Sequence, residues 1–65
     1  MNNEELKEAL INVTPVVYDN IKYRCISAII YRRKNNGKIT VQAELMDMHT
    51  TSITIARPDK ITIDK

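Results

Sequence analysis

Residues 21–48, IKYRCISAIIYRRKNNGKITVQAELMDM, decide the predicted fold because they contain two long β-rich runs separated by a turn. The runs cover residues 21–33 and 39–48, and Asn35-Asn36-Gly37 between them is typical of a hairpin turn. In the second run apolar and polar residues alternate. The apolar residues that share one face are Ile39, Val41, Ala43 and Leu45. The stretch therefore predicts a β-hairpin that rests one face on a core.

The length of the turn sets the register of this hairpin, and the sequence allows two lengths. A two-residue Asn36-Gly37 loop of type I′ would place Ile30 opposite Ala43. A three-residue Asn35-Asn36-Gly37 loop with a glycine bulge would instead place Ile29 opposite Ala43. Because side chains alternate along a strand, the two registers put every residue of the first run on opposite faces.

The two registers differ in which cations share the core side at the outer end of the hairpin. The two-residue loop puts Arg32 and Lys34 on that side and leaves Tyr31 and Arg33 on the outside, and the three-residue loop reverses this assignment. In both registers the tip extends past any core, so we expect its cations to stay in contact with water.

Positive charge is concentrated in the same stretch. Residues 21–43 contain six cations and no acid: Lys22, Arg24, Arg32, Arg33, Lys34 and Lys38. The formal net charge of the whole chain is only +2, because acids outnumber bases on either side of this block. Charges of one sign held on one element focus the local field, so an anionic partner is expected.

A short amphipathic helix is predicted over residues 2–12. Asn2 or Asn3 can cap its first turn, and Leu6 and Leu10 lie four residues apart on one face. Pro15 excludes a helix through residue 14. So short a helix is not stable alone in water, so we expect Leu6, Leu10 and Ile11 to dock on the sheet or on another subunit.

Further short strands are predicted at residues 15–18, 52–56 and 61–63, with a type I turn at Pro58-Asp59 before the last one. The chain is therefore expected to be one mainly β domain, residues 1–65, with the β-barrel over residues 15–63. The expected form is an SH3-like or Sm-like five-stranded barrel or a strongly bent antiparallel sheet.

Several classes of protein are excluded or disfavoured by composition. Cys25 is the only cysteine and His49 the only histidine, which is too few for a disulfide or a structural metal site. Cys25, Asp47 and His49 could form a nucleophilic site if the hairpin places Cys25 opposite Asp47 or Met48, but a buried structural cysteine is favoured. We expect no enzyme activity, no cofactor and no membrane span, and a cytoplasmic protein.

The candidate binding residues lie on or near the hairpin. Arginine and lysine bind phosphate, asparagine amides donate hydrogen bonds, and tyrosine stacks on bases. At 65 residues the core is small, so oligomerisation is the expected additional source of stability. The predicted ligand-binding residues are Tyr23, Arg24, Tyr31, Arg32, Arg33, Lys34, Asn35, Asn36 and Lys38.

Four segments carry a resemblance to small uncharacterised proteins encoded by phages and prophages of Gram-positive bacteria. They are residues 17–23 (VYDNIKY), 26–32 (ISAIIYR), 42–47 (QAELMD) and 52–61 (SITIARPDKI). The chain is also similar in outline to Sm-like RNA binders, although it lacks both motifs of that family. The phage resemblance implies a small oligomer in the cytoplasm of a bacterial host that sequesters nucleotide signals of host immunity.

Three functions follow as hypotheses. The first is a non-enzymatic homo-oligomer that captures a phosphate-bearing nucleotide or oligonucleotide signal through the basic hairpin, as an anti-defence protein. The second is an Sm-like or SH3-like protein that binds RNA or single-stranded DNA. The third is a structural or adaptor protein that binds another protein through an apolar outer face.

Overall fold

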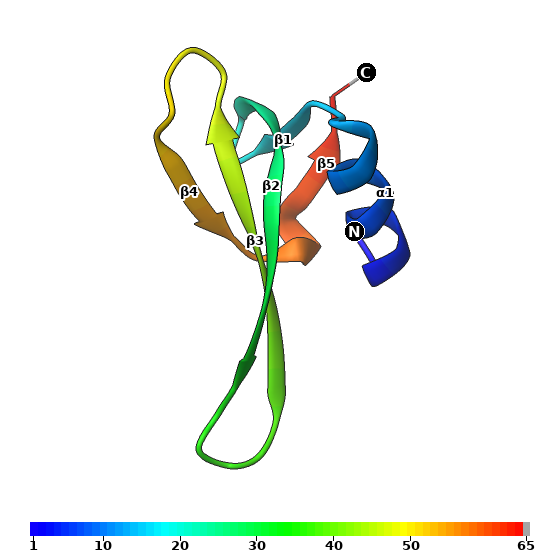
Figure 1. Cartoon of the computed structure of the whole chain (residues 1–65), viewed down its shortest axis with the longest axis vertical. Coiled ribbons are helices and arrows are strands. Elements are labelled where there is room, and N and C mark those ends of the chain that lie inside the picture. The colour runs from blue at the N-terminus through cyan, green and yellow to red at the C-terminus, as the bar shows by residue number, and fades with distance from the viewer. Residues whose placement is uncertain (65) are drawn as a thin grey trace.

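The computed structural model describes residues 1–64 and consists of a short helix followed by five antiparallel strands (Figure 1). The elements are α1 (Asn3–Asn12), β1 (Val16–Tyr18), β2 (Ile21–Arg33), β3 (Ile39–Asp47), β4 (Ile53–Ala56) and β5 (Ile61–Ile63), with a 3₁₀ turn η1 (Pro58–Lys60) between β4 and β5. The predicted mainly β class is confirmed. Each predicted element is found, with ends that differ by no more than one residue.

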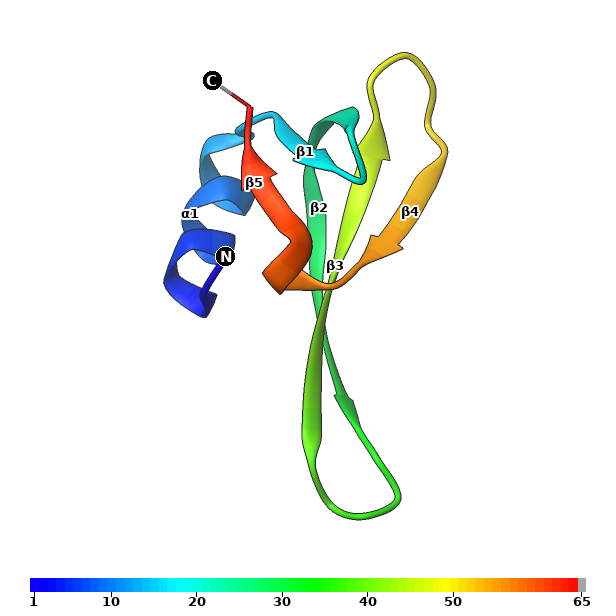
Figure 2. The same ribbon diagram turned by 180° about the vertical axis from the view of Figure 1, so that it is seen from behind.

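The strands form one sheet in the order β4-β3-β2-β1-β5, so β4 and β5 are its two edges. They diverge from the η1 turn that connects them, and within residues 1–64 they do not pair (Figure 2). The sheet is therefore not closed into a barrel, and the alternative that the sequence allowed, a bent antiparallel sheet, describes it. Edge strands of four and three residues offer few free backbone groups for unwanted pairing.

Helix α1 begins with a capping box. The Asn2 side chain accepts a hydrogen bond from the Glu5 backbone at 2.8 Å, and the Glu5 carboxylate accepts one from the Asn2 backbone at 3.0 Å. Val13, the residue that follows the helix, has a left-handed conformation and caps its end. These caps fix the orientation in which Leu6 and Ala9 enter the core.

One hydrophobic core joins the helix to the sheet. Its fully buried large side chains come from four elements and are Leu6, Val16, Ile26 and Leu45. Leu6 is 0% exposed, so α1 is held by a side chain that fits completely into the cluster. The predicted inward face of β3 is confirmed at Ala43 and Leu45, whereas Ile39, further along the same face, is 50% exposed because the hairpin has passed the end of the core.

Strand β2 contains two irregularities in its pairing with β3, between Tyr23 and Cys25 and between Ile26 and Ala28. Between them, Cys25 and Ile26 are in regular register and face opposite sides of the sheet; both are buried, and Ile26 belongs to the core cluster. The irregularities also place Cys25 opposite Met46. The expectation that Cys25 would face Asp47 or Met48 is therefore wrong, because it assumed a strand without bulges.

The buried helix contact leads to a stability prediction. We expect Leu6→Ala to lower the free energy of unfolding by about 2–5 kcal/mol, because it removes a fully buried side chain and leaves a cavity. Urea unfolding followed by circular dichroism measures the change. Lys7→Ala on the same helix is the matched control, since Lys7 is exposed and its replacement should change the free energy of unfolding by about 0.5 kcal/mol or less. Equal losses for the two variants would contradict the docking of α1.

Candidate functional site

The β2–β3 hairpin turns through a three-residue loop. The Lys34 amide donates to the Lys38 carbonyl at 2.8 Å, and the Gly37 amide donates to the Lys34 carbonyl at 2.9 Å. Gly37 has φ +85°, a left-handed conformation that glycine adopts without strain. Ile29 consequently pairs with Ala43, so the structure has the second of the two registers that the sequence allowed.

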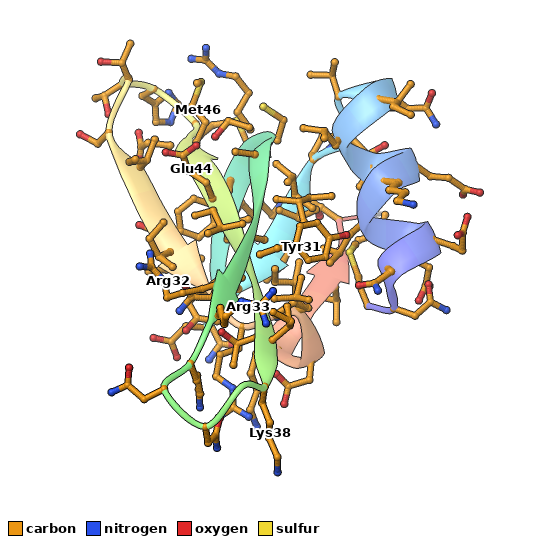
Figure 3. All side chains as sticks on the ribbon, turned by 60° about the horizontal axis from the view of Figure 1, so that its bottom comes forward. Tyr31, Arg32, Arg33, Lys38, Glu44 and Met46 are labelled. Atoms are coloured by element: carbon orange, nitrogen blue, oxygen red, sulfur yellow. The ribbon has the colours of Figure 1, made fainter. Side chains whose placement is uncertain are left out.

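This register sorts the hairpin residues between two faces. Tyr31 and Arg33 lie on the core side of the strand, opposite Val41 and Ile39, while Arg32 lies on the outer side opposite Thr40. Figure 3 shows Tyr31 directed toward the helix side of the molecule and Arg32 directed toward the opposite side. All residues from 31 to 39 are exposed, so the cations of the tip are in contact with water, as expected.

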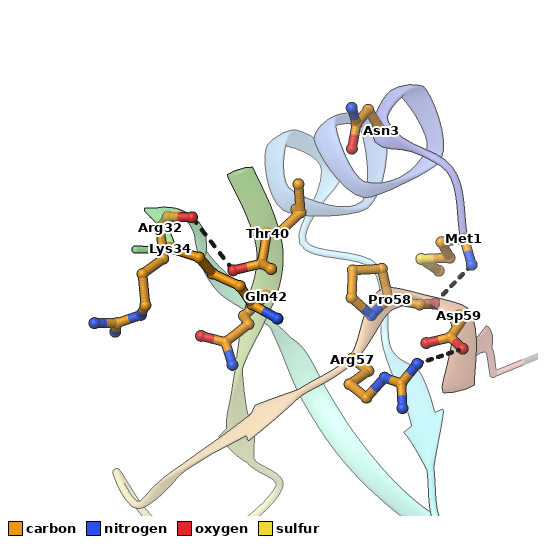
Figure 4. Close-up of a pocket in the computed structure, with 10 residues that line it drawn as sticks. Met1, Asn3, Arg32, Lys34, Thr40, Gln42, Arg57, Pro58 and Asp59 are labelled. Carbon is orange, nitrogen blue, oxygen red and sulfur yellow. Dashed lines mark hydrogen bonds and ion pairs between the residues drawn. The ribbon is translucent and has the colours of Figure 1, made fainter. Parts of the chain in front are cut away.

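A groove of about 760 Å³ lies between the hairpin, the start of α1 and the η1 turn (Figure 4). One wall is formed by the hairpin and the other by the N-terminal residues and the segment that follows β4. The lining residues are Met1, Asn3, Arg32, Lys34, Thr40, Val41, Gln42, Arg57, Pro58 and Asp59. The amino group of Met1 donates to the Pro58 carbonyl at 2.7 Å and so holds two parts of the second wall together.

The groove is positively charged. Among residues 1–64, three cationic side chains line it against one carboxylate, that of Asp59. Asp59 lies 3.4 Å from the Arg57 guanidinium, but both side chains are exposed and such a pair is weak. Arg32 and Lys34 have no ion-pair partner among residues 1–64. An anion in the groove could therefore bind these two cations without first breaking an existing ion pair.

A second hollow of about 470 Å³ adjoins the tip of the hairpin. It is lined only by residues that the sequence predicted as ligand-binding, namely Arg32, Arg33, Lys34, Asn35 and Asn36. The Asn36 side chain accepts a hydrogen bond from the Lys38 amide at 3.1 Å, which stabilises the loop. Arg32 and Lys34 line both hollows, so they are the centre of the basic surface.

The remaining predicted binding residues lie elsewhere. Tyr23 is 6% exposed and its hydroxyl donates to Thr54 at 3.5 Å, so its ring belongs to the core and has no free face for a base. Arg24 donates to the Met48 carbonyl at 3.0 Å, at the other end of β2, roughly 26 Å along the strand from Arg32. Tyr31 is 55% exposed but faces away from the groove.

Sequence reasoning missed the second wall of the groove. Arg57 follows β4, and the pairing of Ala56 with Ala43 places it beside Gln42 on the neighbouring strand. Thr40 and Gln42 lie on the outer face of β3, opposite Arg32 and Ile30. The available signal was the Arg57-Pro58 pair at a predicted turn, but its position beside the hairpin depends on the pairing of β3 with β4.

The possible nucleophilic group of Cys25, Asp47 and His49 is not assembled. Cys25 is buried opposite Met46, and residues 1–64 hold no cluster of His, Cys, Asp and Glu that could bind a metal. Asp47 instead stabilises the β3–β4 loop, because its carboxylate accepts hydrogen bonds from the His49 and Thr50 amides at 2.9 and 3.0 Å. These bonds lower the pKa of Asp47 below its usual value of 3.8.

The role of Asp47 predicts a pH-dependent effect of one substitution. A lowered pKa in the folded state means that ionised Asp47 stabilises the fold above about pH 4 and loses this effect as the pH falls further. Asp47→Asn should therefore destabilise the protein at neutral pH, with a difference from wild type that shrinks in acid. Thermal unfolding of both proteins across this range is the measurement, and a difference independent of pH would contradict the assignment.

No family model matches the chain, and comparison with curated proteins and with solved structures found no match either. The resemblance to phage proteins therefore stays a prediction. Among the described residues, no helix has the length and apolar character needed to span a membrane.

Proposed function

We propose that this protein binds a phosphate-bearing ligand, a nucleotide or short oligonucleotide, in the groove between the basic hairpin and the η1 turn. The observation that carries the proposal is the position of Arg32 and Lys34 on one face, across the groove from Arg57 and without carboxylate partners in residues 1–64. We further propose that it acts as a binding protein and not as an enzyme, consistent with the burial of Cys25 opposite Met46.

The chemistry of the groove suits phosphate more than a carboxylate or a neutral ligand. The planar guanidinium groups of Arg32 and Arg57 can each donate two hydrogen bonds to phosphate oxygens, and Lys34 adds a mobile point charge. Thr40 and Gln42 add a hydroxyl and an amide between the two walls. Figure 4 shows the Arg32 guanidinium directed away from the Arg57 wall, so contact with one phosphate from both sides requires this exposed side chain to change rotamer.

The groove has less to offer a nucleobase. None of the lining residues in the described part of the chain is aromatic, and the exposed ring of Tyr31 lies on the core side of the hairpin. Recognition would therefore rest on phosphate groups, with little discrimination among bases. An anti-defence role, in which the protein sequesters a nucleotide signal, would require further contacts to distinguish that signal.

Binding of RNA or single-stranded DNA along its backbone is the second candidate. It is favoured by the continuation of positive charge past the groove, onto the tip at Lys38. A strand that follows the hairpin could contact all of these cations, whereas a mononucleotide could reach only those of the groove. The two candidates share Arg32 and Lys34 and differ in the number of phosphates bound.

Substitutions on the two faces of the hairpin identify the face that binds the ligand. Arg32→Ala combined with Lys34→Ala should weaken binding of a fluorescent oligonucleotide by about a hundredfold, since each contact to phosphate is worth about 1.5 kcal/mol. Fluorescence anisotropy measures the affinity. Arg33→Ala is the matched control, because it removes a neighbouring cation from the opposite face. If no anionic probe loses affinity in the double variant, the proposal fails and the protein-binding adaptor hypothesis gains.

A salt titration separates the two candidates. A strand that contacts about six phosphates should lose roughly a thousandfold in affinity between about 50 and 200 mM salt, because each contact releases condensed counterions. A nucleotide that meets only the groove should lose far less. If affinity falls steeply with salt for the oligonucleotide, and only slightly for a mononucleotide of equal affinity, binding along the nucleic-acid backbone is favoured.

A further inference from the structure

The outer part of the hairpin has no core beneath it. Residues 31–39 are all exposed, and they extend a two-stranded ribbon away from the rest of the sheet (Figure 1). Isolated two-stranded hairpins are only marginally stable in water. This ribbon would therefore gain stability from a surface that covers one of its faces.

The face opposite the groove is partly apolar. Tyr31 is 55% and Ile39 is 50% exposed, and Arg33 lies directly opposite Ile39 in the register. These three side chains share the core side of the hairpin beyond the end of the core. They form a surface, which we call the Tyr31 face, that combines an aromatic ring, an aliphatic chain and a cation without an ion-pair partner among residues 1–64.

The same chain carries a surface of complementary chemistry. Glu4, Glu8 and Ile11 follow one another at helical spacing along α1, on the side opposite the buried residues Leu6 and Ala9. Ile11 is the most exposed large hydrophobic residue, at 76%. This stripe, which we call the Glu8 stripe, thus offers carboxylates and an aliphatic side chain pointing away from its own sheet.

We propose that the Tyr31 face of one copy docks on the Glu8 stripe of a second copy. The Tyr31 face carries one cation, Arg33, and the Glu8 stripe carries two carboxylates, those of Glu4 and Glu8, so the two surfaces have formal charges of +1 and −2. Arg33 would face Glu4 or Glu8, and Tyr31 and Ile39 would cover Ile11. Because the stripe faces away from the sheet that its own hairpin extends, the contact is made between copies.

This association is independent of the proposed ligand. It uses the Tyr31 face, whereas the phosphate contacts use Arg32 and Lys34 on the other face. Both surfaces of the hairpin could therefore be occupied together, and loss of one function need not remove the other.

Sedimentation velocity of the full chain and of two charge-reversed variants tests the proposal. The wild type should self-associate, and Arg33→Glu or Glu8→Lys alone should each weaken association by about tenfold or more, because like charges then face each other. An equimolar mixture of the two variants should regain association, since the introduced carboxylate of one variant would meet the introduced amino group of the other across the interface. Lys60→Glu is the control for Arg33→Glu, as it also lowers the net charge by two at an exposed residue that belongs to neither surface.

The outcomes are distinct. Restored association in the mixture supports the pairing and also shows that both variants are folded. If the wild type is monomeric up to about 1 mM, the proposal is wrong. Any association except the very weakest would be detected at that protein concentration. The proposal is also wrong if Arg33→Glu leaves the association unchanged, or if the mixture of variants fails to restore it. In either case another surface would be responsible for the association. Oligonucleotide binding by the same variants reports separately on the proposed ligand site.

Discussion

The three-residue loop at Asn35-Asn36-Gly37 is the constraint on which the candidate site depends. Since side chains alternate along a strand, a loop shorter by one residue would exchange the two faces of the hairpin. Arg32 would then face the helix side, and Tyr31 would face the groove. The left-handed Gly37 and the paired backbone of Lys34 and Lys38 fix the observed arrangement. A local turn thereby determines which charges can meet a ligand.

The second constraint is the length of β2 relative to the core. The strand spans thirteen residues, but its buried residues end at Ile26. Two bulges near its start fit the strand to the helix and to β3, and the regular part then continues as an uncovered ribbon. Because the ribbon begins beside the η1 turn, Arg57 from a distant part of the sequence completes the groove. Both faces of the ribbon remain free for contacts.

Much of the fold followed from local signals in the sequence. Alternation in β3, turn residues and the capped helix predicted every element, because each signal lies within a few neighbouring residues. The bulges around Cys25, the open form of the sheet and the hairpin register could not be predicted, since they depend on packing between distant segments. For the same reason the cations of the hairpin were found from sequence, whereas Arg57 and Gln42 required the pairing of β3 with β4.

The most direct test of this account is the hairpin register in solution, measured by nuclear Overhauser contacts between backbone α protons. The Lys34–Lys38 hydrogen bond and the alternation of antiparallel pairs make Tyr31 and Val41 a close, non-hydrogen-bonded pair. The account predicts a strong contact between the α protons of Tyr31 and Val41. A strong contact between Arg32 and Val41 instead would establish the two-residue loop and contradict the assignment of Arg32 and Lys34 to the groove.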